Sequence, residues 1–179
     1  IIVTPSTSPT NATSSISTAT TITIIDDDDP PTVSFSLSAD SIEENSSTDV
    51  TLTATLSVAS EKAVEITYTM SGTATINDEY TITASPITIA AGQTTGTVTI
   101  STNGLDDTDV EVLETIIITF GQVTNATRDT NSLTLNLLSD DKPSVSFSYD
   151  PLTFNESGGT SVITATASAE HSKNITINL

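Results

Sequence analysis

Hydrophobic residues alternate with Ser and Thr through most of the chain. Between Val33 and Leu137, apolar side chains recur at every second position in several short runs, which are separated by turn residues such as Asn45, Gly72 and Gly104. This period is typical of strands with one buried face, because successive side chains of a strand point to opposite faces of the sheet. The pattern predicts seven strands around the runs 33–37, 50–56, 64–68, 87–89, 98–100, 116–120 and 133–137.

The fold class predicted from these runs is all-β. No segment shows the 3.6-residue period of a helix, and the apolar residues are mostly β-branched, which favours strands. Seven short strands separated by turns predict an immunoglobulin-like, antiparallel Greek-key β-sandwich. The Ser and Thr positions would then form its solvent-exposed faces.

The sequence also repeats. The segment PTVSFS at 31–36 returns as PSVSFS at 143–148, a displacement of 112 residues, and TNAT at 10–13 returns at 124–127. We therefore expect tandem repeats, with an incomplete unit on each side of a complete one. The predicted units are the C-terminal strands of a preceding repeat at 1–29, a complete repeat at 30–141, and the N-terminal strands of a following repeat at 142–179.

The two incomplete units would expose unpaired strands at both ends of the chain. Their sheet edges would be unpaired unless missing sequence or a neighbouring copy of the chain completes them, because open edges template association. The chain has no initiator Met or signal peptide, which indicates a piece of a longer polypeptide. It also has no Cys, so neither disulfides nor thiolate metal sites stabilise it.

The net charge of the chain limits the classes of molecule that it can bind. Four basic residues stand against 23 acidic ones, giving a formal net charge of -19. Such a chain repels nucleic acid and anionic membrane surfaces and attracts cations. No window approaches the roughly 20 consecutive apolar residues of a membrane helix, so we expect no membrane insertion.

The acidic residues gather in turns and at strand ends rather than along the strands. Calcium takes six to eight oxygen ligands, so a calcium site would need several of these turns to meet at one end of the sandwich. A Greek-key connection brings alternate loops to one end. The clusters in the complete repeat are 43–44, 78–79, 106–107, 109–114 and 140–141.

Five motifs in order resemble a Calx-beta repeat, the family of sodium–calcium exchanger regulatory domains and of tandem repeats in large bacterial surface proteins. The resemblance covers the complete repeat and, in pieces, both flanks. It implies a calcium cluster at the junction with the next domain. The motifs are SIEEN (41–45), SGTAT (71–75) leading to Glu79 and Tyr80, AAGQT (90–94), DDTDVEVLET (106–115) and SDD (139–141).

Transferred motif by motif, the resemblance implies a set of calcium ligands. Glu79 stands where the family has Asp, so its neighbour Asp78 is an alternative ligand, and Ser139 shortens the terminal acidic run. We therefore expect fewer or weaker ions than in the best-equipped members. The implied ligands are Glu44, Glu79 or Asp78, Asp106, Asp107, the backbone carbonyl of Asp109, Glu111, Glu114, Asp140 and Asp141, with Asp26, Asp27, Asp28 and Asp29 in the preceding repeat and Glu156 in the following one.

Catalysis is not expected. Glu111 and Glu114 could be imagined as a glycosidase pair, but aromatic residues make up only 4% of the chain and Trp is absent, so nothing predicts a sugar-binding cleft. The only His, His171, aligns with Ser60 in a predicted turn and is interpreted as an exposed bystander. Without a base, the many Ser residues have nothing to activate them. We expect that the chain is not an enzyme.

The functional hypothesis is a structural one. We expect calcium-stiffened repeats, each contacting the adjacent repeats, that form the shaft of a secreted or cell-surface adhesin or filament, most simply a bacterial one. Two alternatives remain: repeats that themselves bind a glycan, a surface or a partner protein, and a regulatory calcium sensor. The shaft is favoured because recognition surfaces usually need aromatic or Arg anchors, which are scarce here.

Overall fold

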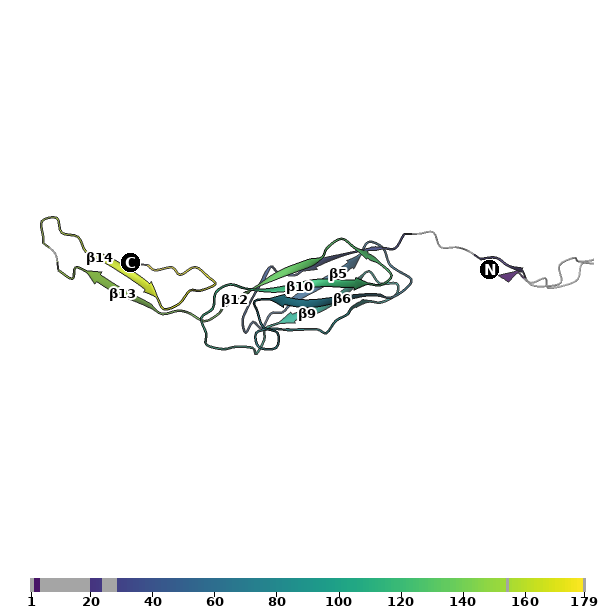
Figure 1. Ribbon diagram of the computed structural model, residues 1–179, viewed down its shortest axis with the longest axis horizontal. Coiled ribbons are helices and arrows are strands. Elements are labelled where there is room, and N and C mark those ends of the chain that lie inside the picture. The colour runs from purple at the N-terminus through teal and green to yellow at the C-terminus, as the bar shows by residue number, and fades with distance from the viewer. Residues whose placement is uncertain (1, 4–19, 24–28, 154, 179) are drawn as a thin grey trace, which may run out of the picture.

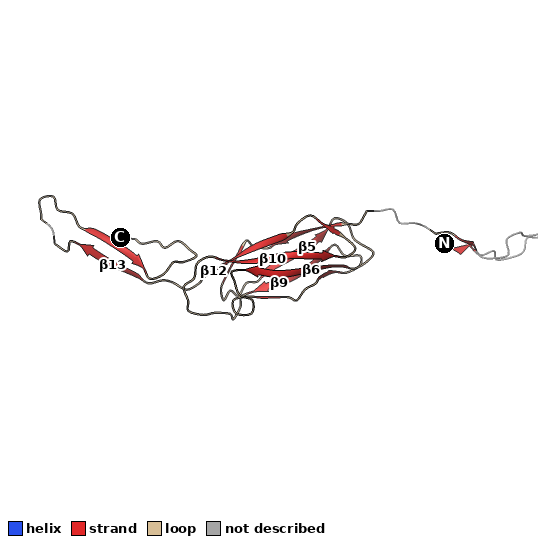
Figure 2. Cartoon of the chain, viewed as in Figure 1, coloured by secondary structure: helices blue, strands red, loops and turns tan. Residues whose placement is uncertain are grey.

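Strands form all the regular structure of the described residues. The computed structural model describes residues 2–3, 20–23, 29–153 and 155–178 (Figure 1). Within these ranges there is no helix (Figure 2), and hence none that could cross a membrane. The predicted all-β class is confirmed.

Ten strands in residues 30–141 form two five-stranded sheets. The first sheet has the order β4 (Ser41–Glu43), β12 (Ser132–Leu138), β10 (Glu114–Val123), β6 (Val64–Gly72), β8 (Ile87–Ile89). The second has the order β11 (Thr127–Arg128), β3 (Thr32–Leu37), β5 (Val50–Leu56), β9 (Thr95–Ser101), β7 (Thr81–Ile82).

Each predicted run lies within a strand, and three short strands were not predicted. These are β4, β7 and β11, each of two or three residues at a sheet edge. Two of them pair in parallel, β4 with β12 and β11 with β3, whereas the other pairs within the two sheets are antiparallel. None of the three contains two apolar residues at alternate positions, as the equally short β8 does, so the sequence carries no alternation signal for them.

The core lies between the two sheets. Leu52 on β5, Ile66 on β6 and Ile118 on β10 have no exposed surface, while the positions between the apolar residues are more open to solvent. The rings of Phe35 on β3 and Phe120 on β10 stack across the sandwich with centroids 3.6 Å apart. Each fully buried aliphatic side chain stabilises the folded state by about 1.5–3 kcal/mol relative to leaving it exposed to water. The apolar period of the sequence thus supplies the β-sandwich core.

Two further strand pairs flank the sandwich. One joins β1 (Ile2–Val3) to β2 (Thr20–Thr21). The other, β13 (Val145–Asp150) with β14 (Val162–Ala167), has the register of β3 with β5: Val145 pairs with Ala167 as Val33 pairs with Leu56. Its apolar side chains, however, are about half exposed, because the described chain provides no opposing sheet for them.

One end of the sandwich collects loops from both sheets. The backbone N–H of Glu44, just after β4, donates to Leu138 O at the end of β12, at 3.0 Å. The next residue, Asn45, donates to Leu105 O at 3.3 Å in the loop between β9 and β10. These contacts place the acidic clusters of several loops beside one another, at the end from which the chain continues to β13.

Candidate metal centre

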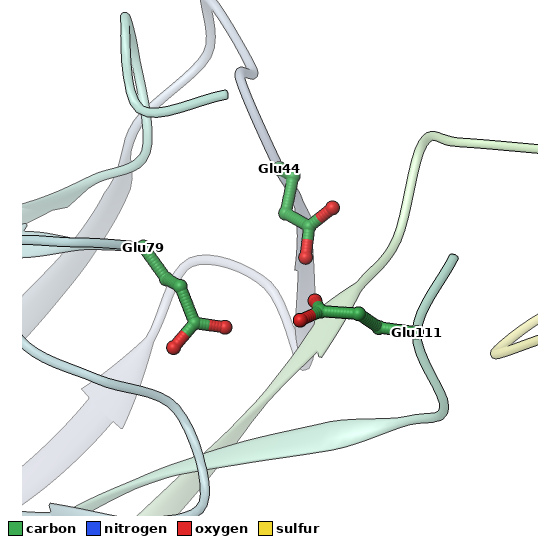
Figure 3. A group of neighbouring side chains, drawn as sticks. All are labelled: Glu44, Glu79 and Glu111. Carbon is green, nitrogen blue, oxygen red and sulfur yellow. The ribbon is translucent and has the colours of Figure 1, made fainter. Parts of the chain in front are cut away.

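Three carboxylates from three loops converge at this end. Glu44 follows β4, Glu79 precedes β7 and Glu111 precedes β10, and each offers an oxygen within 4.8 Å of those of the other two (Figure 3). Like charges at such distances repel strongly when water is excluded. The arrangement therefore needs either shared protons or a cation.

Glu44 is the most buried of the three, with 7% of its surface exposed. Its carboxylate accepts a hydrogen bond from the backbone of Asp140, and a hydrogen bond joins it to the Glu111 carboxyl. Burial raises the pKa of Glu44 to about 8, with the hydrogen bond to Glu111 and the charges of Glu111 and Asp107 adding to the increase. Two carboxyls this close cannot both be charged without strong repulsion, so the pair favours retaining a proton.

A buried hydroxyl fixes the turn that carries Glu44. Thr102 has no exposed surface, and its Oγ1 donates to Glu43 O at 2.7 Å and accepts from Ser46 N at 3.1 Å. The turn passes through Asn45 in the left-handed region, at φ 46°, and the Asn45 Oδ1 accepts from Gly104 N at 3.3 Å. The loop after β9 thus holds Glu44 at a set position.

Glu79 is held by its own turn. One oxygen of its carboxylate accepts a hydrogen bond from the backbone N–H of Thr75, and the Glu79 N–H returns a bond to Thr75 O at 3.0 Å. The second oxygen, Oε1, is buried and has no hydrogen-bond partner among the described residues. That oxygen is free to act as a ligand.

A close backbone approach pins the Glu79 loop to the start of β10. Gly72 has φ +120°, and a Cβ there would lie 2.1 Å from Thr115 O. The following residues, Thr73 and Ala74, both donate their N–H groups to that same oxygen, at 3.0 and 3.1 Å. Only glycine fits this approach, which brings Glu79 beside Glu114.

Glu114, the first residue of β10, extends the cluster. A hydrogen bond to Glu79 is the main reason that its pKa rises to about 7, followed by burial and the charges of Glu79 and Glu111, while a hydrogen bond with Thr73 opposes the rise. Glu111 itself donates its N–H to the Ser139 hydroxyl at 3.4 Å. The Ser139 side chain is 1% exposed, so it packs beneath the cluster instead of facing solvent.

An outer group of aspartates lies beside the glutamates. The pKa of Asp141 is raised by loss of solvation and then by the charges of Asp140, Asp106, Asp107 and Asp109. The Asp107 carboxylate accepts the Asp109 N–H at 2.8 Å, which shapes this loop. The charge of Asp107 also raises the pKa of Glu44, so the outer aspartates lie within electrostatic range of the inner glutamates.

Several buried oxygens in the site lack partners. Burying a carboxylate oxygen without a hydrogen bond costs free energy, and a bound cation removes that cost. In the described ranges the one ion pair joins Lys173 to Glu43, so no basic side chain pairs with the cluster. The unpartnered buried carboxylate oxygens are Glu79 Oε1, Glu111 Oε2, Glu114 Oε2 and Asp141 Oδ2.

The structure brings three of the predicted ligands, Glu44, Glu79 and Glu111, within 4.8 Å of one another. Asp78 is exposed, whereas its neighbour Glu79 is one of these three. Asp29 is exposed, and Glu156 lies exposed in the loop between β13 and β14. Asp26, Asp27 and Asp28 lie outside the described residues. The predicted residues linked at the site by contacts or charge are Glu44, Glu79, Asp106, Asp107, Asp109, Glu111, Glu114, Asp140 and Asp141.

Sequence reasoning missed the polar residues that support the site. Ser139 only interrupts an acidic run in the sequence, and Thr102 follows a strand like many other Ser and Thr residues of the chain. Neither sequence position indicates that the side chain is buried. The interpretation of His171 as an exposed bystander is wrong. The ring is partly buried, and its Nε2 lies 2.6 Å from Asp141 O.

The fold and the site together define a β-sandwich protein with a carboxylate-rich candidate metal centre at one end. Neither a protein-family model nor a curated protein matches the chain. Among solved structures it is similar to the crystal structure of the E. coli chaperone DraB, with 16% sequence identity and a TM-score of 0.34. The match covers 59% of this chain and 54% of that one, and it carries no argument about function.

Proposed function

We propose that residues 30–141 form an immunoglobulin-like Calx-beta repeat that binds calcium at this acidic end. In this proposal, tandem copies build the stiff shaft of a secreted or cell-surface adhesin or filament. The observation that carries the proposal is the convergence of loops on Glu44, Glu79 and Glu111, with buried carboxylate oxygens left unpartnered.

The ligand set favours calcium over other metals. Every candidate ligand is an oxygen, and the chain has no Cys and a single His. Metals that prefer sulfur or nitrogen ligands would therefore bind weakly here. Calcium accepts six to eight oxygens in flexible geometry, whereas magnesium requires a near-ideal octahedron and keeps several waters. Carboxylates contributed by several separate loops suit the larger ion, which takes more oxygen ligands.

The position of the site supports a role at the junction of two units. Asp140 and Asp141 follow β12 and precede β13, which begins at Val145. The shared register of the β3–β5 and β13–β14 pairs supports a second unit of the same kind after this junction. A cation held by the last residues of one unit would hold the linker as well, and would stiffen it.

Titration calorimetry with calcium tests the metal site. Glu111→Gln removes a charged ligand at the centre of the cluster, so we expect calcium affinity to fall at least about tenfold, equivalent to about 1.4 kcal/mol. The matched control is Glu65→Gln, an exposed residue on β6 with the same change of charge, which should leave affinity nearly unchanged. Equal losses from both variants would mean diffuse attraction to a negative surface and would contradict the proposal.

A further inference from the structure

A second set of contacts lies at the acidic end of the sandwich, and it uses backbone carbonyls and Glu43 instead of the converging carboxylates. Three consecutive residues beyond β14, His171, Ser172 and Lys173, each reach a different element of the preceding unit. We name these three residues the docking turn. The contacts join His171 Nε2 to Asp141 O at 2.6 Å, Ser172 N to Glu111 O at 3.0 Å, and Lys173 Nζ to Glu43 Oε1 at 2.6 Å.

The contacts of the His171 ring favour one tautomer. Nδ1 lies 3.2 Å from Lys173 O but closer, at 2.9 Å, to the Lys173 N–H, and the shorter contact decides. The backbone N–H of Lys173 donates to His171 Nδ1 at 2.9 Å, so that nitrogen carries no proton. The proton of the neutral ring is then on Nε2, where it donates to Asp141 O. One tautomer therefore closes the turn and makes the contact with the preceding unit.

The docking turn takes atoms that the proposed metal centre does not use. It bonds the backbone carbonyls of Glu111 and Asp141, and leaves Glu111 Oε2 and Asp141 Oδ2 unpartnered. Its third contact, Glu43, is the exposed neighbour of Glu44 and is not among the converging carboxylates. The turn and a cation can occupy the same end of the sandwich together.

The same turn occurs in the complete unit. There, the Lys62 N–H donates to Ser60 Oγ at 3.1 Å, just as the Lys173 N–H donates to the side chain of His171. Ser60 and His171 are 111 residues apart, the displacement that also separates Leu56 from its counterpart Ala167. The chain has only three Lys residues, and two of them stand at the third position of this turn.

We propose that the docking turn is the interaction surface by which each repeat binds the acidic end of the repeat before it, in one head-to-tail orientation. The partner is a preceding repeat of the same kind, recognised by two backbone carbonyls and a carboxylate. With a net charge of -19, units of this chain repel one another in most orientations. A Lys placed against Glu43 reverses that repulsion locally, and the two hydrogen bonds fix the orientation, since an exposed ion pair alone contributes little.

This inference goes beyond the proposed function because it does not require a metal. The experiment therefore uses the full 179-residue chain in the presence of a chelator, where a failure of calcium binding has no effect on the result. The readout is the hydrogen-exchange rate of the Ser172 amide, measured by NMR. The Ser168 amide, which donates to Ser144 O at 2.9 Å and so joins the two ends of the β13–β14 hairpin, reports whether the hairpin itself stays folded.

Two variants separate docking from turn formation. His171→Ser keeps a side-chain acceptor like that of Ser60 but loses the donor to Asp141, and Lys173→Glu replaces the ion pair with repulsion. We expect each to speed exchange of the Ser172 amide at least about fivefold while Ser168 stays protected. Combining Lys173→Glu with Glu43→Lys should restore protection. The control Lys142→Glu makes the same charge change at the junction, and no ion pair of Lys142 with a described residue is lost.

Three results would overturn the proposal. The first is a Ser172 amide that exchanges in the unaltered chain as fast as an unstructured peptide. The second is a Lys142→Glu variant that releases Ser172 as much as Lys173→Glu does, because charge alone would then explain the effect. The third is equal acceleration at Ser168 and Ser172, which would show unfolding of the hairpin in place of release of the turn.

Discussion

At the scale of single residues, proton sharing describes the site without a cation. Glu44, with a pKa of about 8, and Glu114, with a pKa of about 7, each hydrogen-bond to another carboxyl of the cluster. Both values lie well above the ordinary value of 4.5, so near neutral pH the folded protein holds protons that the unfolded chain has released. A bound cation would take the place of those protons.

The first residue-scale prediction concerns stability against pH. A carboxyl whose pKa is raised by folding stabilises the folded state less as pH rises from the unfolded value of 4.5 through the folded value of about 7 to 8. In chelator, the melting temperature should therefore fall between pH 5 and pH 8.5. Calcium should raise it, and should do so most at the high end of this range, where no protons compete.

Glu44→Gln provides the control for that prediction, measured by differential scanning calorimetry. The variant removes the most strongly shifted carboxyl, so its melting temperature in chelator should depend less on pH than that of the unaltered chain. If the melting temperature of the variant depends equally steeply on pH, then Glu44 is not the group responsible, which would contradict the prediction.

At the scale of elements, the strands follow from the sequence but the loops do not. Alternation marks the seven predicted strands because each buries one apolar face, even the three-residue β8. The short edge strands β4, β7 and β11 carry no such pattern, and their positions follow from pairing with longer neighbours. The motifs identified the acidic residues that converge, Glu44, Glu79 and Glu111. Ser139 and Thr102 were missed because a buried hydroxyl and an exposed one look alike in a Ser- and Thr-rich sequence.

The same limit explains the error at His171. Its neighbours in sequence are polar, so the local pattern predicts exposure; its partners, Asp141 and the preceding unit, lie 30 residues or more away. A contact of this kind depends on how two distant segments pack together, and the hydrophobic pattern of the sequence does not predict such packing. The alignment with Ser60 contained the relevant signal, since both positions accept a hydrogen bond from the backbone of a following Lys.

The element-scale prediction concerns the turn that positions Glu44. Thr102→Val keeps the shape of the side chain but leaves Glu43 O and Ser46 N without their buried partner. Urea denaturation in chelator should show a loss of about 1–3 kcal/mol in the free energy of unfolding. Thr97→Val, at an exposed position on β9, should change it by less than about 0.5 kcal/mol. Equal changes in both variants would remove the assigned role of Thr102.

At the scale of the whole molecule, the acidic site lies at the end of the sandwich from which the chain continues to the β13–β14 pair. The chain leaves the sandwich through Asp140 and Asp141, and the docking turn returns to the same end. Extracellular calcium modules bind with dissociation constants of about 10⁻⁴–10⁻³ M, and calcium at ten times that value adds about 1.4 kcal/mol per site. That is enough to shift a hinge equilibrium about tenfold.

The whole-molecule prediction is a narrower junction geometry with calcium. Spin labels at Glu61→Cys and Ser157→Cys, both exposed and on separate units of a chain without native Cys, report the distance across the junction. Pulsed electron–electron double resonance should give a narrower distribution of the label-to-label distance with calcium than with chelator. Identical distributions, at concentrations where calorimetry shows the site filled, would contradict calcium stiffening while leaving the fold intact.

The central claim is that the converging carboxylates hold calcium, and a crystal grown with calcium tests it most directly. An anomalous difference map should show a peak with oxygens of Glu44, Glu79 and Glu111 at about 2.3–2.6 Å, the distance of calcium ligands. A map at saturating calcium with no peak at this position would contradict the account.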